Sequence, residues 1–266
     1  MIIDFHTHCF PDKIAPRAME VLKSTGDIPN YTDGTIADSL RLMKECGVDK
    51  AVICNIATNP KQQVNVNNFA IMVNNTYPEF ISFGSVHPDS NENDIKSELK
   101  RLKNAGIKGI KLHPEYMNKY ITDDSYKIIF KTCAELDLIV LTHSGFDYVS
   151  IDIMRCTPYD LSKIIVEYPT LKLVAAHFGG ARVWDDAEKY LVGKKIWFDL
   201  STMVAEHMDK PQAYRMANAH DPEKLLFATD MPWSNPIEDI NYIKSLNLDN
   251  ELQKKIFYKN AVKLLS

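Results

Sequence analysis

Eight short apolar segments alternate with helical patterns along the chain, and this alternation constrains the fold more than any other feature of the sequence. The segments are rich in β-branched residues and lie at residues 2–6, 50–56, 80–86, 107–113, 138–143, 171–177, 195–200 and 224–230. Strands that are apolar along both faces are typical of parallel sheets, which helices cover on each side. The alternation therefore predicts an α/β protein built from eight strand–helix units.

Amphipathic stretches between these segments predict the helices, at residues 35–47, 63–78, 93–106, 124–136, 157–169 and 184–193. Several of them stop at residues that end helices, such as Gly47, Pro78 and Gly106. A further helix is expected within residues 206–220, starting at Pro211, because proline suits the first turn. The residues from 236 onward predict one or two closing helices.

A single (β/α)8 TIM barrel spanning residues 1–266, with closing C-terminal helices, fits this pattern best. The chain has 266 residues, and such a barrel typically needs about 250. The alternative is an open doubly wound sheet, which needs a glycine-rich loop after the first strand; HTHCFPDK contains no glycine. Residues 9–34 form the longest connection and are expected to form a lid over the mouth of the barrel.

The composition of the chain limits which partners and which cellular compartment are expected. The chain is 45% hydrophobic and 25% charged with a formal net charge of -4, so we expect neither a nucleic-acid nor a membrane partner. No apolar run approaches the ~20 residues of a membrane span. The five cysteines form no CxxC pair, and Asp4 and His6 lie where a signal peptide would be basic and then apolar. A cytoplasmic protein with reduced thiols is therefore expected.

Potential metal ligands collect at the C-terminal ends of the predicted strands. Six of the eight histidines lie there, together with a lysine and an aspartate: His6, His8, His87, Lys111, His113, His143, His177 and Asp230. In a barrel these strand ends converge on one mouth, where active sites are built. The arrangement predicts a metal site more strongly than any one motif does.

The pair His6 and His8 is the centre of this prediction. Residues two apart in a strand share a side, so Asp4, His6 and His8 are expected in the barrel interior, with Ile3 and Phe5 facing the helices. Two imidazoles on one side suit a single ion.

A nitrogen from His143 and an oxygen from Asp230 complete a mixed set of ligands. Such a set suits one divalent metal, zinc first, and it also accepts manganese, iron or cobalt. Catalytic zinc keeps an open position for water, and these ligands leave room for one.

The strand-end motifs DFHTH, LTHSG, AAHFGG and FATDMPW resemble the amidohydrolase superfamily. More closely they resemble its amidohydrolase-related branch, which includes aminocarboxymuconate-semialdehyde decarboxylase and the resorcylate-type decarboxylases. The resemblance spans almost the whole chain. It implies His6, His8, His143 and Asp230 as ligands, Asp230 also in proton transfer, and His177 beside the water or substrate oxygen. It also makes a homodimer plausible.

Lys111 has two interpretations. Binuclear members of the superfamily carry a carbamylated lysine at the end of strand 4, and Lys111 in IKLHP lies near that position and shares a side with His113. We favour one metal, because an unmodified lysine is a cation and repels a second ion. Otherwise Lys111 pairs with a carboxylate such as Asp4, or with substrate.

Six further residues are candidates for binding substrate: His87, His113, Arg155, Arg182, Trp184 and Trp233. The arginines suit a substrate carboxylate, and the tryptophans suit a pocket wall. Capping of turns by the two histidines, solvation of the arginines and loop packing by the tryptophans are the alternatives. His207 either reaches substrate or is solvated, and His220 is expected to be structural.

Two reactions of a small-molecule substrate stay open. The first is hydrolysis of a small amide, ester or lactone by a metal-activated water; the second is non-oxidative decarboxylation of an aromatic or unsaturated acid. Phosphoesterases that open with HxH usually carry a late Asp-x-His, and no histidine follows Asp230. TatD-like nucleases require a glutamate at strand 4. The full set of ligands argues against a binding protein without activity.

Overall fold

Eight parallel strands form the centre of the computed structural model, which describes residues 1–26, 29–148, 150–202 and 207–266. The strands are β1 (Ile3–Thr7), β2 (Lys50–Cys54), β3 (Phe80–Phe83), β4 (Gly109–Leu112), β5 (Ile139–Thr142), β6 (Lys172–Ala175), β7 (Trp197–Asp199) and β8 (Leu225–Leu226). Each strand coincides with one predicted segment, and β1 continues one residue beyond its segment. The strand prediction is confirmed.

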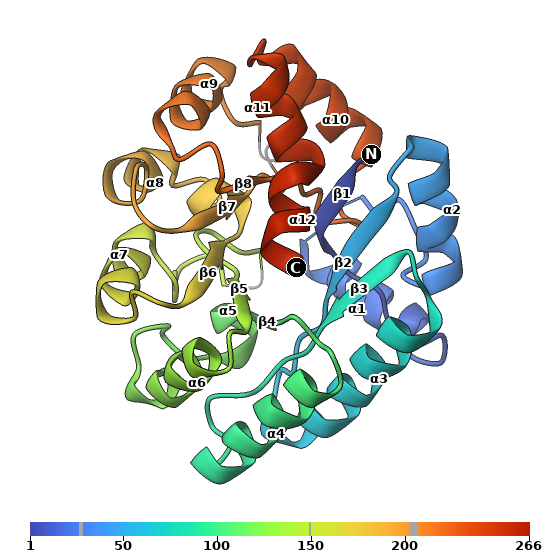
Figure 1. The fold of residues 1–266 in the computed structure, drawn as a ribbon. Helices are drawn as coiled ribbons and strands as arrows, with labels where there is room; N and C mark the ends of the chain where they lie inside the picture. Colours follow the sequence, from blue (N-terminus) through green and yellow to red (C-terminus); the bar gives the residue numbers. More distant parts are fainter. Residues whose placement is uncertain (27–28, 149, 203–206) are drawn as a thin grey trace.

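The strands close into a ring. Parallel pairing follows chain order within two groups, β1-β2-β3 and β4-β5-β6-β7-β8. A bridge between Gly84 and Ile110 joins β3 to β4, and a bridge between Thr7 and Met231 joins β1 to the chain after β8. Around Figure 1 the strands therefore follow one another about a single axis, with α12 in front of them. The fold is a (β/α)8 barrel, as predicted.

Helices connect the strands and cover the outside of the ring (Figure 1). They are α1 (Ala15–Gly26), α2 (Ile36–Cys46), η1 (Pro60–Gln62), α3 (Gln63–Thr76), α4 (Glu92–Asn104), α5 (Pro114–Met117), α6 (Asp124–Glu135), α7 (Pro158–Glu167), η2 (His177–Gly179), α8 (Trp184–Tyr190), α9 (Lys210–Ala219), α10 (Pro236–Ser245), α11 (Asn250–Lys254), η3 (Lys255–Lys259) and α12 (Asn260–Leu265). Every predicted helical stretch overlaps one of these helices, and α4 begins one residue before its predicted stretch. None of the helices in the described part of the chain is both long and apolar enough to cross a membrane.

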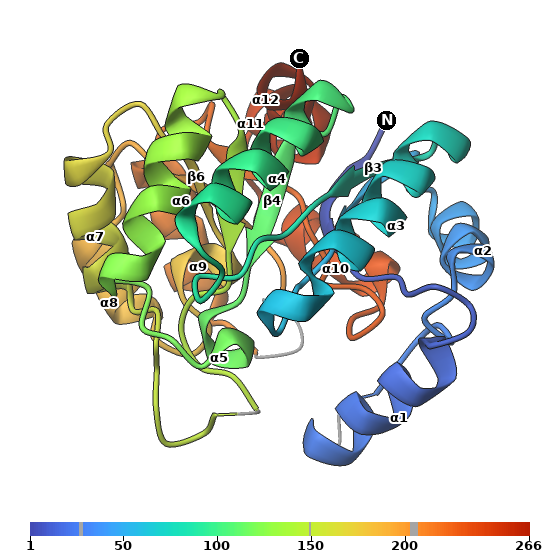
Figure 2. The same cartoon turned by 90° about the horizontal axis from the view of Figure 1, so that it is seen from below.

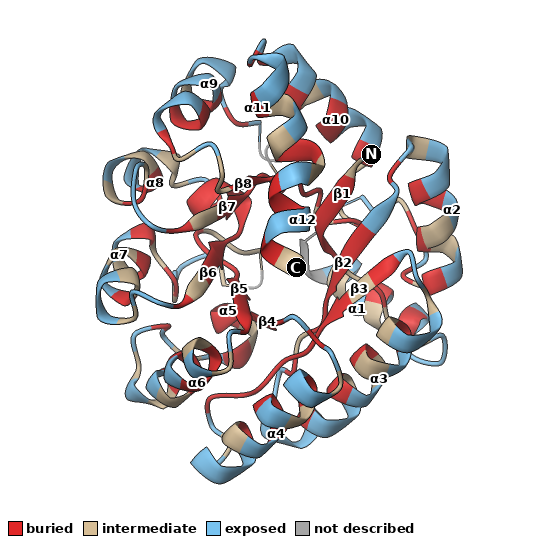
Figure 3. Cartoon of the chain, in the orientation of Figure 1, coloured by how far each residue is buried: buried red, intermediate tan, exposed pale blue. Residues whose placement is uncertain are grey.

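Local sequence explains where the helices begin and end. Thr35 caps α2 by accepting a hydrogen bond from the backbone N–H of Asp38, and Gly47 ends it with a φ of +73°, which glycine adopts without strain. Helix α9 begins one residue before Pro211, and the side chain of Asp209 caps it. The inner faces of the helices are buried and their outer faces are exposed (Figure 3).

The barrel interior is apolar at the end opposite the mouth, and α12 closes it there. Ala261 and Leu264 of α12 pack against strand residues such as Leu141 and Leu226. Ile3 and Phe5 belong to this interior cluster, and Phe5 meets Phe83 edge-on with ring centroids 5.8 Å apart. The prediction that Ile3 and Phe5 face the helices is therefore wrong.

A β-bulge in β1 is the physical reason for this error. Asp4 pairs with Ala51 and Thr7 with Ile53, so β1 has one residue more than β2 over the same length. An extra residue changes which way the following side chains point. Alternation counted back from His6 is therefore wrong by one residue before the bulge. Phe5 faces the interior as His6 does, and His6 contacts residues of β4 and β7.

The predicted lid, residues 9–34, contains α1, and residues 27–28 of it lie outside the described residues. Figure 2 shows α1 on the same side of the barrel as α5, which directly follows β4. The segment therefore borders the mouth, defined here as the C-terminal ends of the strands. Its role as a lid stays a prediction.

Candidate metal centre

His6, His8 and Asp230 meet at the mouth of the barrel, although 224 positions separate the first from the last. The Nε2 atoms of the two histidines lie 3.2 Å apart. Oδ1 of Asp230 lies 3.0 Å from Nε2 of His8 and 3.3 Å from Nε2 of His6. The structure thus brings three of the four predicted ligands together.

Hydrogen bonds to the other ring nitrogens assign the tautomers of both histidines. Nδ1 of His6 lies 3.0 Å from Oδ2 of Asp199, and Nδ1 of His8 lies 2.9 Å from the carbonyl oxygen of Cys54. A carboxylate and a carbonyl only accept, so each Nδ1 carries the proton and donates it. Both Nε2 atoms therefore present lone pairs toward Asp230.

This donor set fits a divalent metal ion. Among the described residues the buried Oδ1 of Asp230 has no hydrogen-bond partner, and neither close Nε2 atom carries a proton to offer it. Three electron-rich atoms at these separations repel one another unless a cation lies among them. Two zinc ligands at about 2.0–2.1 Å in tetrahedral geometry are about 3.3 Å apart, which matches the observed distances.

His143, the fourth predicted ligand, lies beside this group but not within it. Nε2 of His143 is not within 4.8 Å of all three ligand atoms. His143 groups instead with His113 and Asp147, and its Nε2 lies 3.9 Å from Oδ2 of Asp147. Nδ1 of His143 lies 3.0 Å from Nε2 of His177, and the buried Nε2 of His143 has no hydrogen-bond partner in the part of the chain that the structure describes. Its role as a ligand stays a prediction.

Lys111 is fully buried, and its Nζ lies 2.7 Å from Nε2 of His6. Burial lowers the pKa of this amine below its ordinary value. The alternative pairing with Asp4 is not present, because Asp4 instead accepts hydrogen bonds from the backbone and side chain of Thr229, at 3.0 and 2.6 Å. Lys111 thus points into the centre as a donor.

The protonation states suit metal binding. Burial lowers the pKa of His6, His143 and His177 well below the ordinary histidine value, so these rings are neutral at pH 7. Burial alone would raise the pKa of Asp230, but His6 and His8 outweigh it and hold the pKa below its usual range. Neutral imidazoles and an ionised carboxylate are the forms that bind metal.

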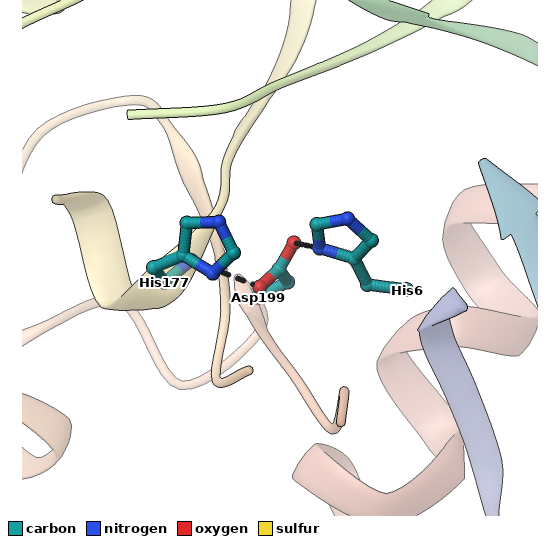
Figure 4. Close-up of side chains that lie close together, drawn as sticks. All are labelled: His6, His177 and Asp199. Carbon is teal, nitrogen blue, oxygen red and sulfur yellow. Dashed lines mark hydrogen bonds and ion pairs between the residues drawn. The ribbon is translucent and has the colours of Figure 1, made fainter. Parts of the chain in front are cut away.

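Asp199 and Ser201 are residues of the centre that the sequence reasoning missed. Asp199 ends β7, is fully buried, and lies between His6 and His177 (Figure 4). Ser201 bridges Asp199 and His177, with its Oγ 2.8 Å from Nδ1 of His177. The signal was present, because KIWFDL ends its apolar run in an aspartate as other segments end in histidine.

His177 has both ring nitrogens engaged, by Ser201 and by His143. Its backbone φ is +59°, and its carbonyl oxygen accepts a hydrogen bond from Nε1 of Trp184 at 3.0 Å. A direct role in proton transfer therefore requires one of the ring contacts to break. The backbone N–H of Trp233 similarly donates to the carbonyl oxygen of Asp230, so both tryptophans support the loops that carry site residues.

His87 and His113 cap turns. Nδ1 of His87 accepts from the backbone N–H of Asp89 at 3.1 Å, and Nδ1 of His113 accepts from that of Tyr116 at 3.4 Å. The ring of His113 also stacks between those of Tyr116 and His143, with centroids 3.8 and 4.3 Å apart. His113 therefore lies against the centre, whereas the capping of His87 involves the surface turn after β3.

The remaining candidates have other partners. Arg155 binds the buried carboxylate of Glu115 at 2.8 Å, and Arg182 lies over the ring of Phe146 and donates to the hydroxyl of Tyr148. A substrate carboxylate would have to compete with these contacts, so the predicted substrate roles stay untested. His220 bonds the backbone of Gly193 and Ile196 as a structural residue, and His207 is exposed.

Solved structures with the same fold include two enzymes. An uncharacterised TIM-barrel protein from Bordetella bronchiseptica is 15% identical with a TM-score of 0.79, covering 99% of this chain and 98% of that chain. The 5-carboxyvanillate decarboxylase of Novosphingobium aromaticivorans, complexed with manganese and 4-hydroxy-3-methoxy-5-nitrobenzoic acid, is 14% identical with a TM-score of 0.75, covering 100% and 96%. A probable 2-pyrone-4,6-dicarboxylic acid hydrolase from Acinetobacter baumannii, with citric acid bound, is 19% identical with a TM-score of 0.70, covering 99% and 98%.

These identities establish the fold alone, and no curated protein matches the chain. The family model of the amidohydrolases, in contrast, matches residues 3–266. The resemblance expected from the strand-end motifs is confirmed, and the chain belongs to the amidohydrolase family.

Proposed function

We propose that this amidohydrolase-family protein is a metal-dependent hydrolase of a small amide, ester or lactone. The observation that carries the proposal is the triangle of His6 Nε2, His8 Nε2 and Asp230 Oδ1, with sides of 3.0–3.3 Å and no proton to share. His143 is the proposed fourth ligand, because its buried Nε2 has no hydrogen-bond partner within residues 1–26, 29–148, 150–202 and 207–266. Zinc suits these ligands, with manganese the first alternative and iron or cobalt next.

Asp230 is the proposed general base. When bound, a divalent ion supplies Lewis acidity that polarises a carbonyl and makes water more acidic. The carboxylate of Asp230 is ionised at neutral pH because its pKa is lowered. It accepts a proton from the attacking water and passes that proton to the leaving group.

Lys111 is the proposed partner of the substrate oxygen that becomes negative. Its Nζ reaches the centre from β4, where the surrounding barrel excludes water. A fixed donor in a dry site stabilises developing charge far better than one in bulk water. This role uses unmodified Lys111 with one metal and needs no carbamate.

Decarboxylation of an aromatic acid is the second candidate, and the ring stack beside the centre favours it. The rings of Tyr116, His113 and His143 are nearly parallel, with interplanar angles of 18° and 14°. The outer face of such a stack suits a planar substrate, and the decarboxylase of similar fold binds a nitrobenzoic acid. Here Lys111 would hold the substrate carboxylate, and a proton would be added at carbon in place of water attack.

One assay series separates the two reactions. Protein stripped with chelator and reloaded with zinc or manganese is given esters, amides and lactones in one arm, and hydroxybenzoates under anaerobic conditions in the other. We expect metal-dependent turnover in the first arm. Release of CO2 from a hydroxybenzoate with no hydrolysis would establish decarboxylation instead, and failure to retain any divalent metal would contradict both candidates.

A further inference from the structure

Asp199 accepts hydrogen bonds from two sides of the candidate metal centre. We propose that this one carboxylate fixes the tautomers of His6, His177 and His143, and so presents the lone pairs of His6 and His143 to the metal. The inference rests on the proposed function, because the lone pairs have a purpose only if a metal binds. Asp199 is a positioning residue, since it acts through the histidines.

The first branch is direct. Oδ2 of Asp199 lies 3.0 Å from Nδ1 of His6, so Nδ1 carries the proton. Independent support comes from Lys111, whose Nζ lies 2.7 Å from Nε2 of His6 on the other side of the ring. An ammonium group only donates, so Nε2 must be the acceptor. Both contacts select the same tautomer.

The second branch passes through Ser201. Oδ1 of Asp199 accepts from the backbone N–H of His177 at 3.0 Å, and from the backbone N–H and hydroxyl of Ser201 at 3.2 and 2.5 Å. Because Ser201 gives its proton to Asp199, its Oγ accepts from Nδ1 of His177, 2.8 Å away. Nε2 of His177 is then free of a proton.

The branch ends at His143. Since Nε2 of His177 accepts, Nδ1 of His143 must donate across the 3.0 Å contact between them. Nε2 of His143 is left as a lone pair, and no residue that the structure describes makes a hydrogen bond with this buried atom. A histidine with its proton on Nε2 could not bind a metal through that atom. The series of hydrogen bonds that starts at Asp199 therefore decides whether His143 can be a ligand.

An Asp199→Asn substitution reverses the direction of one of these hydrogen bonds, the one between residue 199 and Nδ1 of His6. Three donors converge on Oδ1, so the amide oxygen of an Asp199→Asn variant takes that position and the NH2 group faces Nδ1 of His6. The NH2 group then favours the proton on Nε2 of His6, which displaces the contact from Nζ of Lys111. The Ser201 branch is kept. Ser201 Oγ also lies 3.4 Å from Nδ1 of His6, a weaker contact than the 3.0 Å one to Asp199.

The experiment reads tautomers and metal affinity separately. Metal-free protein carrying 15N-histidine is examined by NMR, with a His6→Gln variant to assign that ring, and zinc affinity is measured by competition with a chromogenic chelator. We expect Nδ1–H on His6 in the wild type and Nε2–H in Asp199→Asn, with zinc binding weakened about 10–100-fold. Ser201→Ala should leave His6 unchanged but give mixed tautomers at His177 and His143.

Ser82→Ala is the matched control, because Ser82 is an equally buried strand serine whose hydroxyl accepts from Asn55, which keeps its second bond to Phe83. It should leave tautomers and zinc affinity unchanged. Nδ1–H on His6 in Asp199→Asn, together with wild-type affinity, would overturn the proposal. If Asp199→Asn fails to fold, unchanged tautomers in Ser201→Ala would overturn it. A wild type that binds no zinc refutes the proposed function, while the tautomers of the metal-free protein still test this inference.

Discussion

Asp230 holds its side chain in place through an uncommon backbone conformation. Its φ of +66° lies in the left-handed region, as does the φ of +59° at His177. Aspartate and asparagine adopt this region more readily than most residues, and strained positions cluster at functional sites. At the end of β8 this turn brings the carboxylate back over β1, where Asp230 N donates to the carbonyl oxygen of His6 at 2.8 Å.

An Asp230→Asn variant therefore changes charge with little change of backbone preference. We expect zinc affinity to fall at least about 100-fold, because a neutral amide replaces the anionic ligand and offers a poorer base. Affinity by chelator competition and thermal stability of the metal-free protein check this. Asp124→Asn removes an exposed carboxylate paired with Lys127 and should keep wild-type affinity. Equal affinities in the two variants would refute the role of Asp230.

At the scale of elements, α12 and the mouth have separate tasks. The helix closes the barrel at the end opposite the metal centre, with Leu264 only 6% exposed among interior strand residues. Barrel enzymes commonly separate stability from chemistry in this way. The separation can be measured within α12 itself, since Val262 of the same helix is 48% exposed.

Leu264→Ala is expected to lower the free energy of unfolding by about 2–5 kcal/mol, as buried leucine truncations do. Val262→Ala, the matched exposed truncation, should change it by less than about 0.5 kcal/mol. Urea denaturation of the metal-free proteins measures both. Zinc affinity of folded Leu264→Ala should equal that of the wild type, and a loss of affinity would show that α12 also shapes the mouth.

The positions of the strands were predictable from the sequence. The orientation of side chains was less predictable, because tertiary contacts determine it at several positions. The strand positions and the meeting of His6, His8 and Asp230 followed from apolar runs and polar strand ends. The bulge in β1 did not, because IIDFHTH carries no glycine or proline to mark it. The orientation of His143 depends on His177, a partner 34 positions away, and no local pattern encodes that contact.

At the scale of the whole molecule, the neutral histidines at the mouth set a dependence of stability on pH. Burial lowers the pKa of four of them, namely His6, His113, His143 and His177. Each contributes stability that is fully present above about pH 6.5 and is lost as the pH falls. Burial acts oppositely on Asp4, raising its pKa to about 7, and on Asp239. Those two carboxyls contribute stability that is lost as the pH rises.

The four histidines at the mouth outnumber the two carboxyls, and burial lowers the pKa of His87 and His220 as well, so unfolding takes up protons as the pH falls from 6.5 toward 5. The free energy of unfolding of the metal-free protein should therefore fall on acidification, by about 1.4 kcal/mol per pH unit for each net proton taken up, and this slope steepens toward pH 5 as the unfolded histidines become protonated. Urea midpoints at several pH values in chelator measure this slope. His113→Gln should reduce it by about one proton, or about 1.4 kcal/mol per pH unit. A midpoint that rises toward pH 5 would contradict this balance.

The bridge between Thr7 and Met231 also shows that the metal centre can form only after the last strand has been synthesised. Asp230 follows His6 by 224 positions in the chain, so it is synthesised later. At about 5–20 residues per second, roughly 11–45 s separate their synthesis. Until Asp230 is synthesised, His6 and His8 lack this third ligand and β1 has no neighbour after β8. Metal binding by His6, His8 and Asp230 therefore requires a complete ring of strands. An ion bound by these three residues cannot guide the early steps of folding, but it can stabilise the folded barrel.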